Sequence, residues 1–199
     1  RARGASCGHP DVQKHDEQIP TISVDYGFPG LPDQPATDLP FLVIKDRASK
    51  TVWSCALPSK GVENPYGSRC LLQALRETGY KRLILKSDQE HSIRALCNAA
   101  KNAFEGEVVP EAAPKENHEK SNGEAEATVK QVHGLARTFK EMVENRAKCS
   151  IPSKHPMLAW MLDHAGTMLS LYSKGEQKDG LTPYQRLKGK PWRVALPPF

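Results

Sequence analysis

The chain has 199 residues, of which 38% are hydrophobic and 26% charged, and its formal net charge is +5. This length suits one medium-sized domain with attached segments, because a domain usually takes roughly 100–200 residues. The longest apolar runs are far shorter than the ~20 residues of a membrane-spanning helix, so we expect no membrane span. The positive charge is compatible with a polyanionic partner but does not require one.

The cysteines are odd in number and widely scattered, at Cys7, Cys55, Cys70, Cys97 and Cys149. None of them forms a CxxC pair, so the sequence indicates neither a disulfide framework nor a complete zinc site. We therefore expect reduced thiols in an intracellular protein. The chain opens on Arg1 without a signal-like apolar segment, which indicates a piece of a longer protein.

The first half of the chain is predicted to begin with an arm and three strands. Residues 1–18 are polar and contain glycine and proline, which is typical of a linker or extended arm. Three runs rich in β-branched and aromatic residues follow, at 19–28, 41–44 and 51–57. Short links between them favour an antiparallel meander.

The apolar period then changes to that of a helix. One helix is predicted around Cys70 to Leu75 and ends at Gly79. A short buried strand follows at 83–85, and Ser87 or Asp88 is predicted to cap the next helix, which ends near Phe104. Residues 108–109 are predicted to form a fifth strand.

The clearest element is a helix from Glu124 to about Ala147, because apolar residues repeat there at spacings of three and four. This stripe consists of Ala125, Val129, Val132, Ala136, Phe139 and Val143. A polar loop is predicted before it, at 110–123. Beyond it we expect a helix past Pro156, a short element at 182–187 and extended chain at 191–199.

This order of elements predicts an α/β architecture, a mixed five-stranded sheet flanked by helices with a C-terminal helical extension. The first strand would be central and lie beside the fourth. We divide the chain into an arm at 1–18, a core at 19–147, and a helical extension with an incomplete C-terminal segment at 148–199.

Three acidic residues stand at informative places: Asp25 within the first strand, Asp88 at the end of the fourth, and Glu126 one turn into the long helix. Each has a simpler explanation, as an outward-pointing strand residue, a helix cap or a favourable anion at a helix start. Together, carboxylates at three such places can converge on divalent metal ions, which take oxygen ligands. Two such ions can clamp the attacking and leaving oxygens of a phosphoryl transfer.

The sequence segments around these three residues are SVDYGF, LKSDQE and SNGEAEATVK. They resemble the catalytic core of retroviral and retrotransposon integrases, the DDE polynucleotidyl transferases, which have a ribonuclease H-like fold. The 38 positions between Asp88 and Glu126 (126 − 88) are close to the family's spacing. The segment GLTPYQRLKGKPW resembles one downstream of such cores in copia-type elements, so the likeness spans about residues 19–193.

The resemblance implies the integrase domain of a retrotransposon polyprotein, which binds DNA and carries out metal-dependent 3′-end processing and strand transfer. Asp25, Asp88 and Glu126 would be both the catalytic residues and the ligands of two Mg²⁺ or Mn²⁺ ions. Rival third carboxylates are Glu116, Glu119 and Glu124, and the position of Glu126 after Asn122-Gly123 favours it.

The partners implied by the resemblance are element DNA ends and target DNA, with a homo-oligomer as the working form and no membrane. The protein would be intracellular, and in the nucleus at the step of integration. The family's zinc-binding amino-terminal module has no counterpart here. Cys7, His9 and His15 are therefore interpreted as part of the linker rather than as zinc ligands.

The long helix also indicates contact with DNA. Lys130, His133, Arg137 and Lys140 follow Glu126 along its non-apolar side, and such a basic track suits phosphates. The resemblance implies that Lys130 and His133 correspond in position to family residues that contact the element's DNA end. The alternative is a solvated charged face with a Glu126–Lys130 pair. Further phosphate affinity would come from Lys86, Lys115, Lys120, Arg47 and Lys50.

Two other functions stay open at this stage. One is a ribonuclease H-like nuclease that cleaves RNA–DNA hybrids. The other is a non-catalytic nucleic-acid-binding relic of an integrase, in which the basic helix matters and the carboxylates are idle.

Overall fold

The computed structural model describes residues 19–30, 39–109, 123–174 and 177–194. All five predicted strands are confirmed, with bounds within two residues of those expected. They are β1 (Thr21–Gly27), β2 (Phe41–Asp46), β3 (Val52–Ala56), β4 (Arg82–Lys86) and β5 (Glu107–Val109). The predicted arm at 1–18, and with it Cys7, His9 and His15, lies outside the described residues.

The strands form one mixed sheet in the order β3-β2-β1-β4-β5. β1 pairs antiparallel with β2 and parallel with β4, β3 pairs antiparallel with β2, and β5 pairs parallel with β4. The prediction that the first strand is central and lies beside the fourth is therefore confirmed.

The helices are α1 (Tyr66–Thr78), α2 (His91–Ala103), α3 (Gly123–Ala147), α4 (Pro156–Tyr172) and α5 (Pro183–Lys188). Gly79 ends α1 in the left-handed conformation, with φ at 72°, as predicted. The predicted cap of α2 was wrong: Glu90, not Ser87 or Asp88, occupies the N-cap position, and its side chain makes no capping bond. The chain turns once more before α2 begins, because Asp88 Oδ1 accepts the backbone N–H of Glu90.

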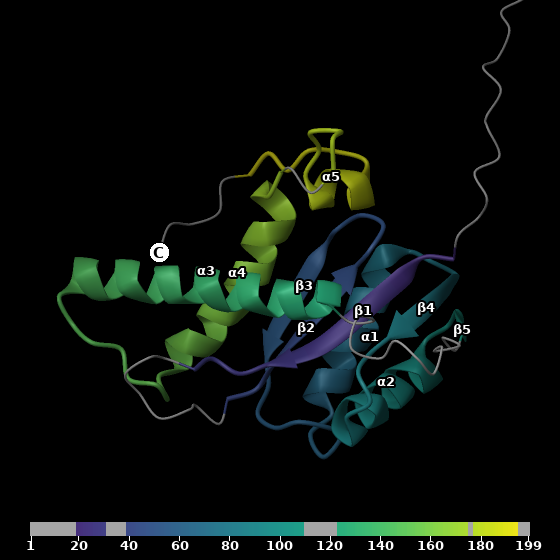
Figure 1. The fold of residues 1–199 in the computed structure, drawn as a ribbon, viewed down its shortest axis with the longest axis horizontal. Helices are drawn as coiled ribbons and strands as arrows, with labels where there is room; N and C mark the ends of the chain where they lie inside the picture. The colour runs from purple at the N-terminus through teal and green to yellow at the C-terminus, as the bar shows by residue number, and fades with distance from the viewer. Residues whose placement is uncertain (1–18, 31–38, 110–122, 175–176, 195–199) are drawn as a thin grey trace, which may run out of the picture.

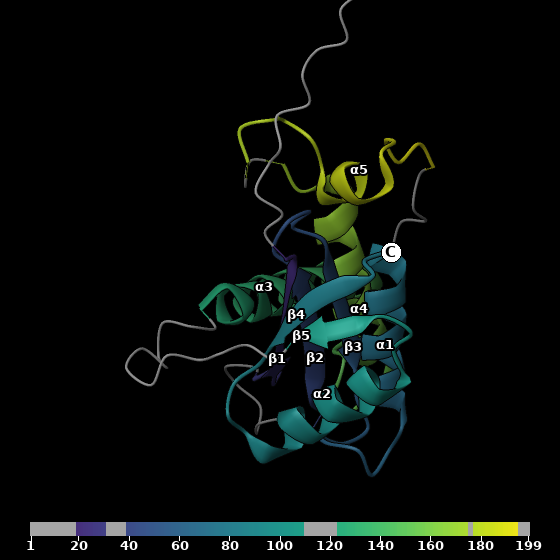
Figure 2. The same ribbon diagram turned by 90° about the vertical axis from the view of Figure 1, so that its right-hand side faces the viewer.

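Helices cover both faces of the sheet, and strand alternation supplies a hydrophobic core to each. On β2, Leu42 and Ile44 face the cluster formed with α1 and α2, while Phe41 and Val43 face the cluster formed with α3 and α4. Figure 2 shows α3 on one side of the sheet and α1 on the other. In Figure 1, α3 crosses the sheet near its own N-terminal end and runs on beyond it.

The long helix buries the predicted side. Ala125, Val132, Ala136 and Phe139 are buried, together with Thr128, which the apolar stripe did not include. α3 packs against β1, β2 and α4. Among the described residues, no helix combines the length and apolar character that crossing a membrane requires.

α4 approaches β3 more closely than ordinary side chains allow. The hydroxyl of Ser54 on β3 donates to the carbonyl of Leu162 at 2.6 Å and accepts the N–H of Gly166 at 3.0 Å. A Cβ at position 166 would lie 2.8 Å from the Ser54 backbone nitrogen, so the contact requires glycine. α4 is thus seated directly on the sheet beside α3.

Candidate active site

Asp25 and Asp88 come to the same level because β1 and β4 are parallel. The last paired residues of the two strands are Ser23 and Lys86, and each aspartate lies two positions beyond its partner of that pair. The carboxyl ends of adjacent parallel strands meet at one edge of a sheet, which is where sites in open α/β sheets form.

Asp25 is half-buried on the face of β1 that α3 covers. It stands opposite Val43, whose side chain belongs to the cluster under α3 and α4. Its Oδ1 atom accepts its neighbour's N–H, that of Tyr26, at 2.8 Å, which fixes the carboxylate on the strand. The residue is therefore half-buried on this face rather than fully exposed to solvent.

Burial is the main cause that raises the pKa of Asp25 from 3.8 to about 6. The Tyr26 N–H opposes the shift, whereas the negative charges of Asp88, Glu126 and Glu90 add to it. The two other predicted carboxylates are therefore near enough to repel Asp25, although they come from a different strand end and from a helix.

Asp88 is exposed in the turn between β4 and α2. Its carboxylate accepts the N–H of Glu90 at 3.1 Å, which stabilises this turn. The N-cap position of α2 is occupied by Glu90. The simpler explanation of Asp88 as the residue that caps α2 is therefore excluded.

Glu126 is exposed in the first turn of α3, and its rival Glu124 is engaged elsewhere. Glu124 receives Lys50 Nζ at 2.7 Å and Arg47 Nε at 2.9 Å, from the turn between β2 and β3. Burial acts to raise the pKa of Glu124, but these two hydrogen bonds outweigh it and hold the pKa below its usual value. The other rivals, Glu116 and Glu119, lie outside the described residues.

The donor set fits a hard divalent cation in its chemistry, because all three predicted ligands offer carboxylate oxygens. A cation would offset the repulsion among the carboxylates, which adds to the effect of burial on the pKa of Asp25. Within the described part of the chain, however, no three acidic, histidine or cysteine side chains stand close enough to hold a metal ion as they are. Asp88 and Glu126 are both exposed and would have to turn toward Asp25.

Two residues beside this site were missed by the sequence reasoning. Glu90 acts on the charge of Asp25, and Lys60 donates to both carboxylate oxygens of Glu90 at 2.7 and 2.8 Å. The ammonium of Lys60 also lies 4.8 Å from the ring centre of Phe28. Glu90 lies within the segment LKSDQE, so its nearness to the site could have been inferred from the sequence. Nothing in the sequence links Lys60 to Glu90.

The basic residues along α3 differ in exposure and in ion pairing, although their regular spacing predicted one continuous basic face. Lys130 is exposed and makes no ion pair with Glu126 among the described residues. Lys140 Nζ pairs with Glu144 at 2.7 Å, and this side chain is 12% exposed. His133 is half-buried, and burial followed by the charge of Arg137 lowers its pKa, against a hydrogen bond to the backbone of Gly30.

Among the other cations suggested as phosphate contacts, Lys115 and Lys120 lie outside the described residues, and the remaining three are engaged or buried. Arg47 and Lys50 hold Glu124, as described above. Lys86 is 8% exposed, at the end of β4. Of the members of the predicted set that the structure describes, Lys130 is thus the one that the fold leaves most available to a ligand.

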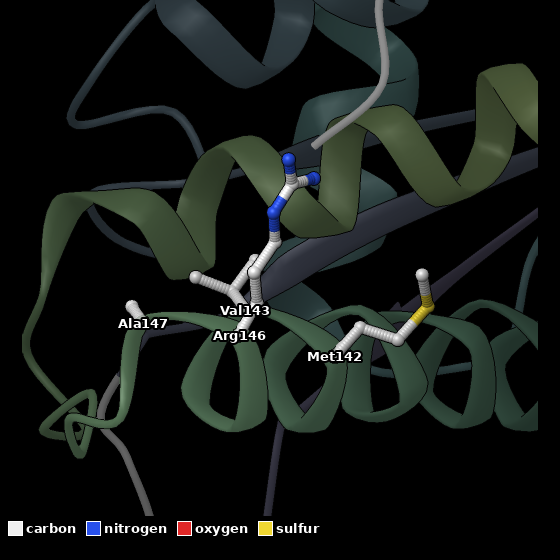
Figure 3. A pocket seen from close by; sticks show the side chains of 4 residues that line it. All are labelled: Met142, Val143, Arg146 and Ala147. Atoms are coloured by element: carbon white, nitrogen blue, oxygen red, sulfur yellow. The ribbon is translucent and has the colours of Figure 1, made fainter.

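A hollow of about 370 Å³ lies at the far end of α3, away from the carboxylates. Figure 3 shows Met142, Val143 and Arg146 rising from the same side of this helix, with Ala147 beyond them. Met142 lies sixteen residues (142 − 126) after Glu126, which is about 24 Å along a helix. This hollow does not belong to the candidate active site.

No protein-family model matches this sequence, and no curated protein matches it. Solved structures do match. The catalytic core domain of HTLV-2 integrase in complex with magnesium, in its trimeric form, is 13% identical with a TM-score of 0.58. The match covers 84% of this chain and 95% of that chain.

Two further solved structures are also similar to this chain. The dimeric form of the same HTLV-2 domain is 12% identical with a TM-score of 0.55, over 83% of this chain and 92% of that chain. A chain of the simian T-cell lymphotropic virus intasome, in complex with PP2A regulatory subunit B56 gamma, is 13% identical with a TM-score of 0.59. That match covers 90% of this chain and 57% of that chain.

At this level of identity the likeness shows the fold. The chain has the ribonuclease H-like fold of retroviral integrase catalytic cores, a mixed five-stranded sheet flanked by helices. The fold class expected from the sequence is therefore confirmed.

Proposed function

We propose that this chain is a polynucleotidyl transferase of the DDE type, with Asp25, Asp88 and Glu126 as its catalytic carboxylates. More specifically, it would be the integrase domain of a copia-type retrotransposon polyprotein. The observation that carries the proposal is the parallel pairing of β1 and β4, which brings Asp25 and Asp88 to the same edge of the sheet. The negative charges of Asp88 and Glu126 also act on Asp25, whose pKa is raised mainly by burial. The integrase-like fold supports the same reaction class.

In this proposal the three side chains have distinct tasks. Asp25 is fixed on the central strand by the N–H of Tyr26 and would be the rigid ligand. Asp88 and Glu126 are exposed and would close on it from a turn and a helix. Bound Mg²⁺ or Mn²⁺ would stabilise the charge that develops on the attacking and leaving oxygens of the phosphoryl transfer.

The test is the joining of a labelled blunt-ended DNA duplex to supercoiled plasmid in the presence of Mg²⁺ or Mn²⁺. We expect joined product from the wild-type chain. Asp25→Asn, Asp88→Asn and Glu126→Gln should each lower the rate at least about 100-fold, the scale of losing one electrostatic stabiliser of a transition state. Circular dichroism would establish that each variant is folded.

Glu124→Gln is the matched control, because Glu124 is an acidic neighbour of Glu126 in the same turn but is bound to Lys50 and Arg47. It should keep its joining activity. Near-normal joining by one of the three amide variants would remove that residue from the site. Cleavage of an RNA–DNA hybrid without joining would identify a nuclease, and DNA binding without either reaction a relic.

We further propose that Lys130 contacts a phosphate of the bound DNA end, and that His133, Arg137 and Lys140 line the path beyond it. Lys130→Ala should weaken binding of a DNA duplex and lower the slope of log affinity against log salt by about one, as loss of a single phosphate contact does. Fluorescence anisotropy at several salt concentrations measures both. Lys148→Ala, a change at the exposed end past α3, should leave the slope unchanged.

Concerted insertion of two DNA ends needs two active sites, so we propose a homo-oligomer that acts on element and target DNA in the nucleus. The similar HTLV-2 domain is described in dimeric and trimeric forms, and the simian virus protein in an intasome. Light scattering of the chain with and without a DNA duplex tests this assembly.

A further inference from the structure

A fourth carboxylate, that of Glu90, stands beside the three that the proposed function uses. Glu90 lies two positions after Asp88, and its backbone N–H donates to Oδ1 of Asp88 at 3.1 Å. Its negative charge also acts on Asp25. Glu90 therefore belongs to the turn that would have to close on Asp25, and it offers the oxygen ligands that a hard divalent cation takes.

The carboxylate of Glu90 is already engaged by two other side chains. Lys60 Nζ donates to Oε1 at 2.7 Å and to Oε2 at 2.8 Å, so the ammonium lies across both oxygens. The hydroxyl of Ser92 donates to Oε1 at 2.6 Å. A carboxylate has only about four lone-pair sites for donors and cations. A metal ion could therefore bind both oxygens of Glu90 only by displacing Lys60.

Lys60 is itself held against the end of β1. Its ammonium lies 5.1 Å from the ring centre of Tyr26 and 4.8 Å from that of Phe28, and aromatic faces attract cations at such distances. The next residue, Gly61, donates its N–H to the Tyr26 hydroxyl at 3.1 Å. Tyr26 directly follows Asp25 in β1. The loop that carries Lys60 is thus anchored to the strand that carries Asp25.

The pairing of Lys60 with Glu90 matters because a fourth carboxylate would change how the ions act. Mg²⁺ takes octahedral coordination by oxygen and is usually held by one or two carboxylates, waters and substrate phosphates. A further carboxylate would take the place of a water or of a phosphate oxygen. It would also cancel part of the positive charge that stabilises the attacking and leaving oxygens.

We propose that Lys60 is a positioning residue that keeps Glu90 away from the metal ions, so that the ions are held by the three catalytic carboxylates alone. Lys60 does this by occupying both oxygens of Glu90 from a loop that is fixed to β1. This inference rests on the proposed function, because it requires that Asp25, Asp88 and Glu126 hold the ions.

The test measures Mn²⁺ binding to the metal-free 199-residue chain by isothermal titration calorimetry, together with the joining of DNA. Lys60→Met keeps the length of the side chain but removes the ammonium, which frees Glu90. We expect Mn²⁺ to bind about 10-fold more tightly and joining to fall about 10-fold, the smaller of the changes that residues beside metal ligands produce. Adding Glu90→Gln should return both values to those of the wild type, because the fourth carboxylate is then gone.

Three further variants serve as controls. Lys60→Arg should behave as the wild type, because a guanidinium also donates to both oxygens of a carboxylate. Arg82→Met breaks the exposed pair of Arg82 with Glu107, whose atoms lie 3.2 Å apart, and should change neither measurement. Circular dichroism establishes that each variant is folded. Lys60→Gln replaces Lys60→Met, with the same expectations, if the latter does not fold.

Two results would overturn the inference while leaving the proposed function intact. One is unchanged Mn²⁺ binding and joining in Lys60→Met. The other is a loss of both that Glu90→Gln does not reverse, which a merely structural role of Lys60 predicts. If instead the wild type shows no Mn²⁺ binding that Asp25→Asn removes, the proposed metal site is wrong, and the inference is wrong with it.

Discussion

At the scale of single residues, Asp25 and Glu124 are acidic side chains with opposite effects on stability. Asp25 is half-buried beside other carboxylates, and its pKa is raised to about 6. Glu124 is paired with Lys50 and Arg47, and its pKa is lowered. The first charge opposes folding at neutral pH, whereas the second supports it.

For Asp25 the sign follows from proton binding. Between pH 3.8 and about 6 the folded chain holds a proton on Asp25 that the unfolded chain has lost. Raising the pH through this window therefore lowers the free energy of unfolding, and the full penalty applies above pH 6. The shift sets an upper limit of about 3 kcal/mol, and solvent around the partly exposed group reduces this to about 1–2 kcal/mol.

Asp25→Asn should remove this penalty. In EDTA, its free energy of unfolding relative to wild type should rise by about 1–2 kcal/mol between pH 4 and pH 7.5. Urea denaturation at the two pH values measures the difference. Glu124→Gln should show the opposite trend, because the stability from its ion pairs is present above pH 4.5 and lost as the pH falls. Parallel trends in the two variants would contradict this account of the charges.

At the scale of elements, the junction of α4 with β3 depends on one glycine. Ser54 bridges the strand to the helix through Leu162 and Gly166. A Cβ at position 166 would meet Ser54 Oγ at 2.3 Å and its backbone nitrogen at 2.8 Å. Since a strand backbone cannot move aside as a side-chain end can, the helix itself would have to shift.

Gly166→Ala should therefore destabilise the protein by about 1–3 kcal/mol, the usual cost of overpacking a core. Gly134→Ala is the matched change in α3, where a Cβ meets nothing within 4 Å. It should stabilise by about 0.5–1 kcal/mol, because alanine favours a helix more than glycine does. Thermal and urea unfolding measure both. Equal effects of the two changes would show that the contact with Ser54 is unimportant.

At the scale of the whole molecule, α4 completes the hydrophobic cluster that α3 begins. Leu158, Met161 and Leu162 of α4 are buried with Phe41 and Phe139 in that cluster. Each buried side chain of this size contributes about 1.5–3 kcal/mol. Three of them together match the lower end of the ~5–15 kcal/mol that stabilises a folded protein.

The core expected at 19–147 should consequently not fold alone. A chain that ends at residue 147 should give a poorly dispersed NMR spectrum and bind the dye ANS. A chain that ends at residue 174, after α4, should keep the dispersed spectrum of the full protein. A cooperative, stable fold of residues 19–147 would instead support the domain division expected from the sequence.

The sequence predicted the order and type of the elements because their signals are local. Alternating apolar residues in β1 and β2, the stripe on α3 and Gly79 after α1 each act within a few positions. The candidate carboxylates were proposed from the sequence segments around Asp25, Asp88 and Glu126, and their role stays a prediction. The cap of α2 was misassigned because Ser87 and Asp88 are favoured cap residues, whereas the start of the helix at Glu90 depends on the turn that Asp88 stabilises.

What the sequence determined by itself is thus the set of elements and the acidic residues that the fold could bring together. Tertiary structure decided which residues meet: Glu124 pairs with Lys50 and Arg47, and Lys60 donates to Glu90. These contacts join residues far apart along the chain. Their existence depends on how the layers pack, which no local pattern of residues records.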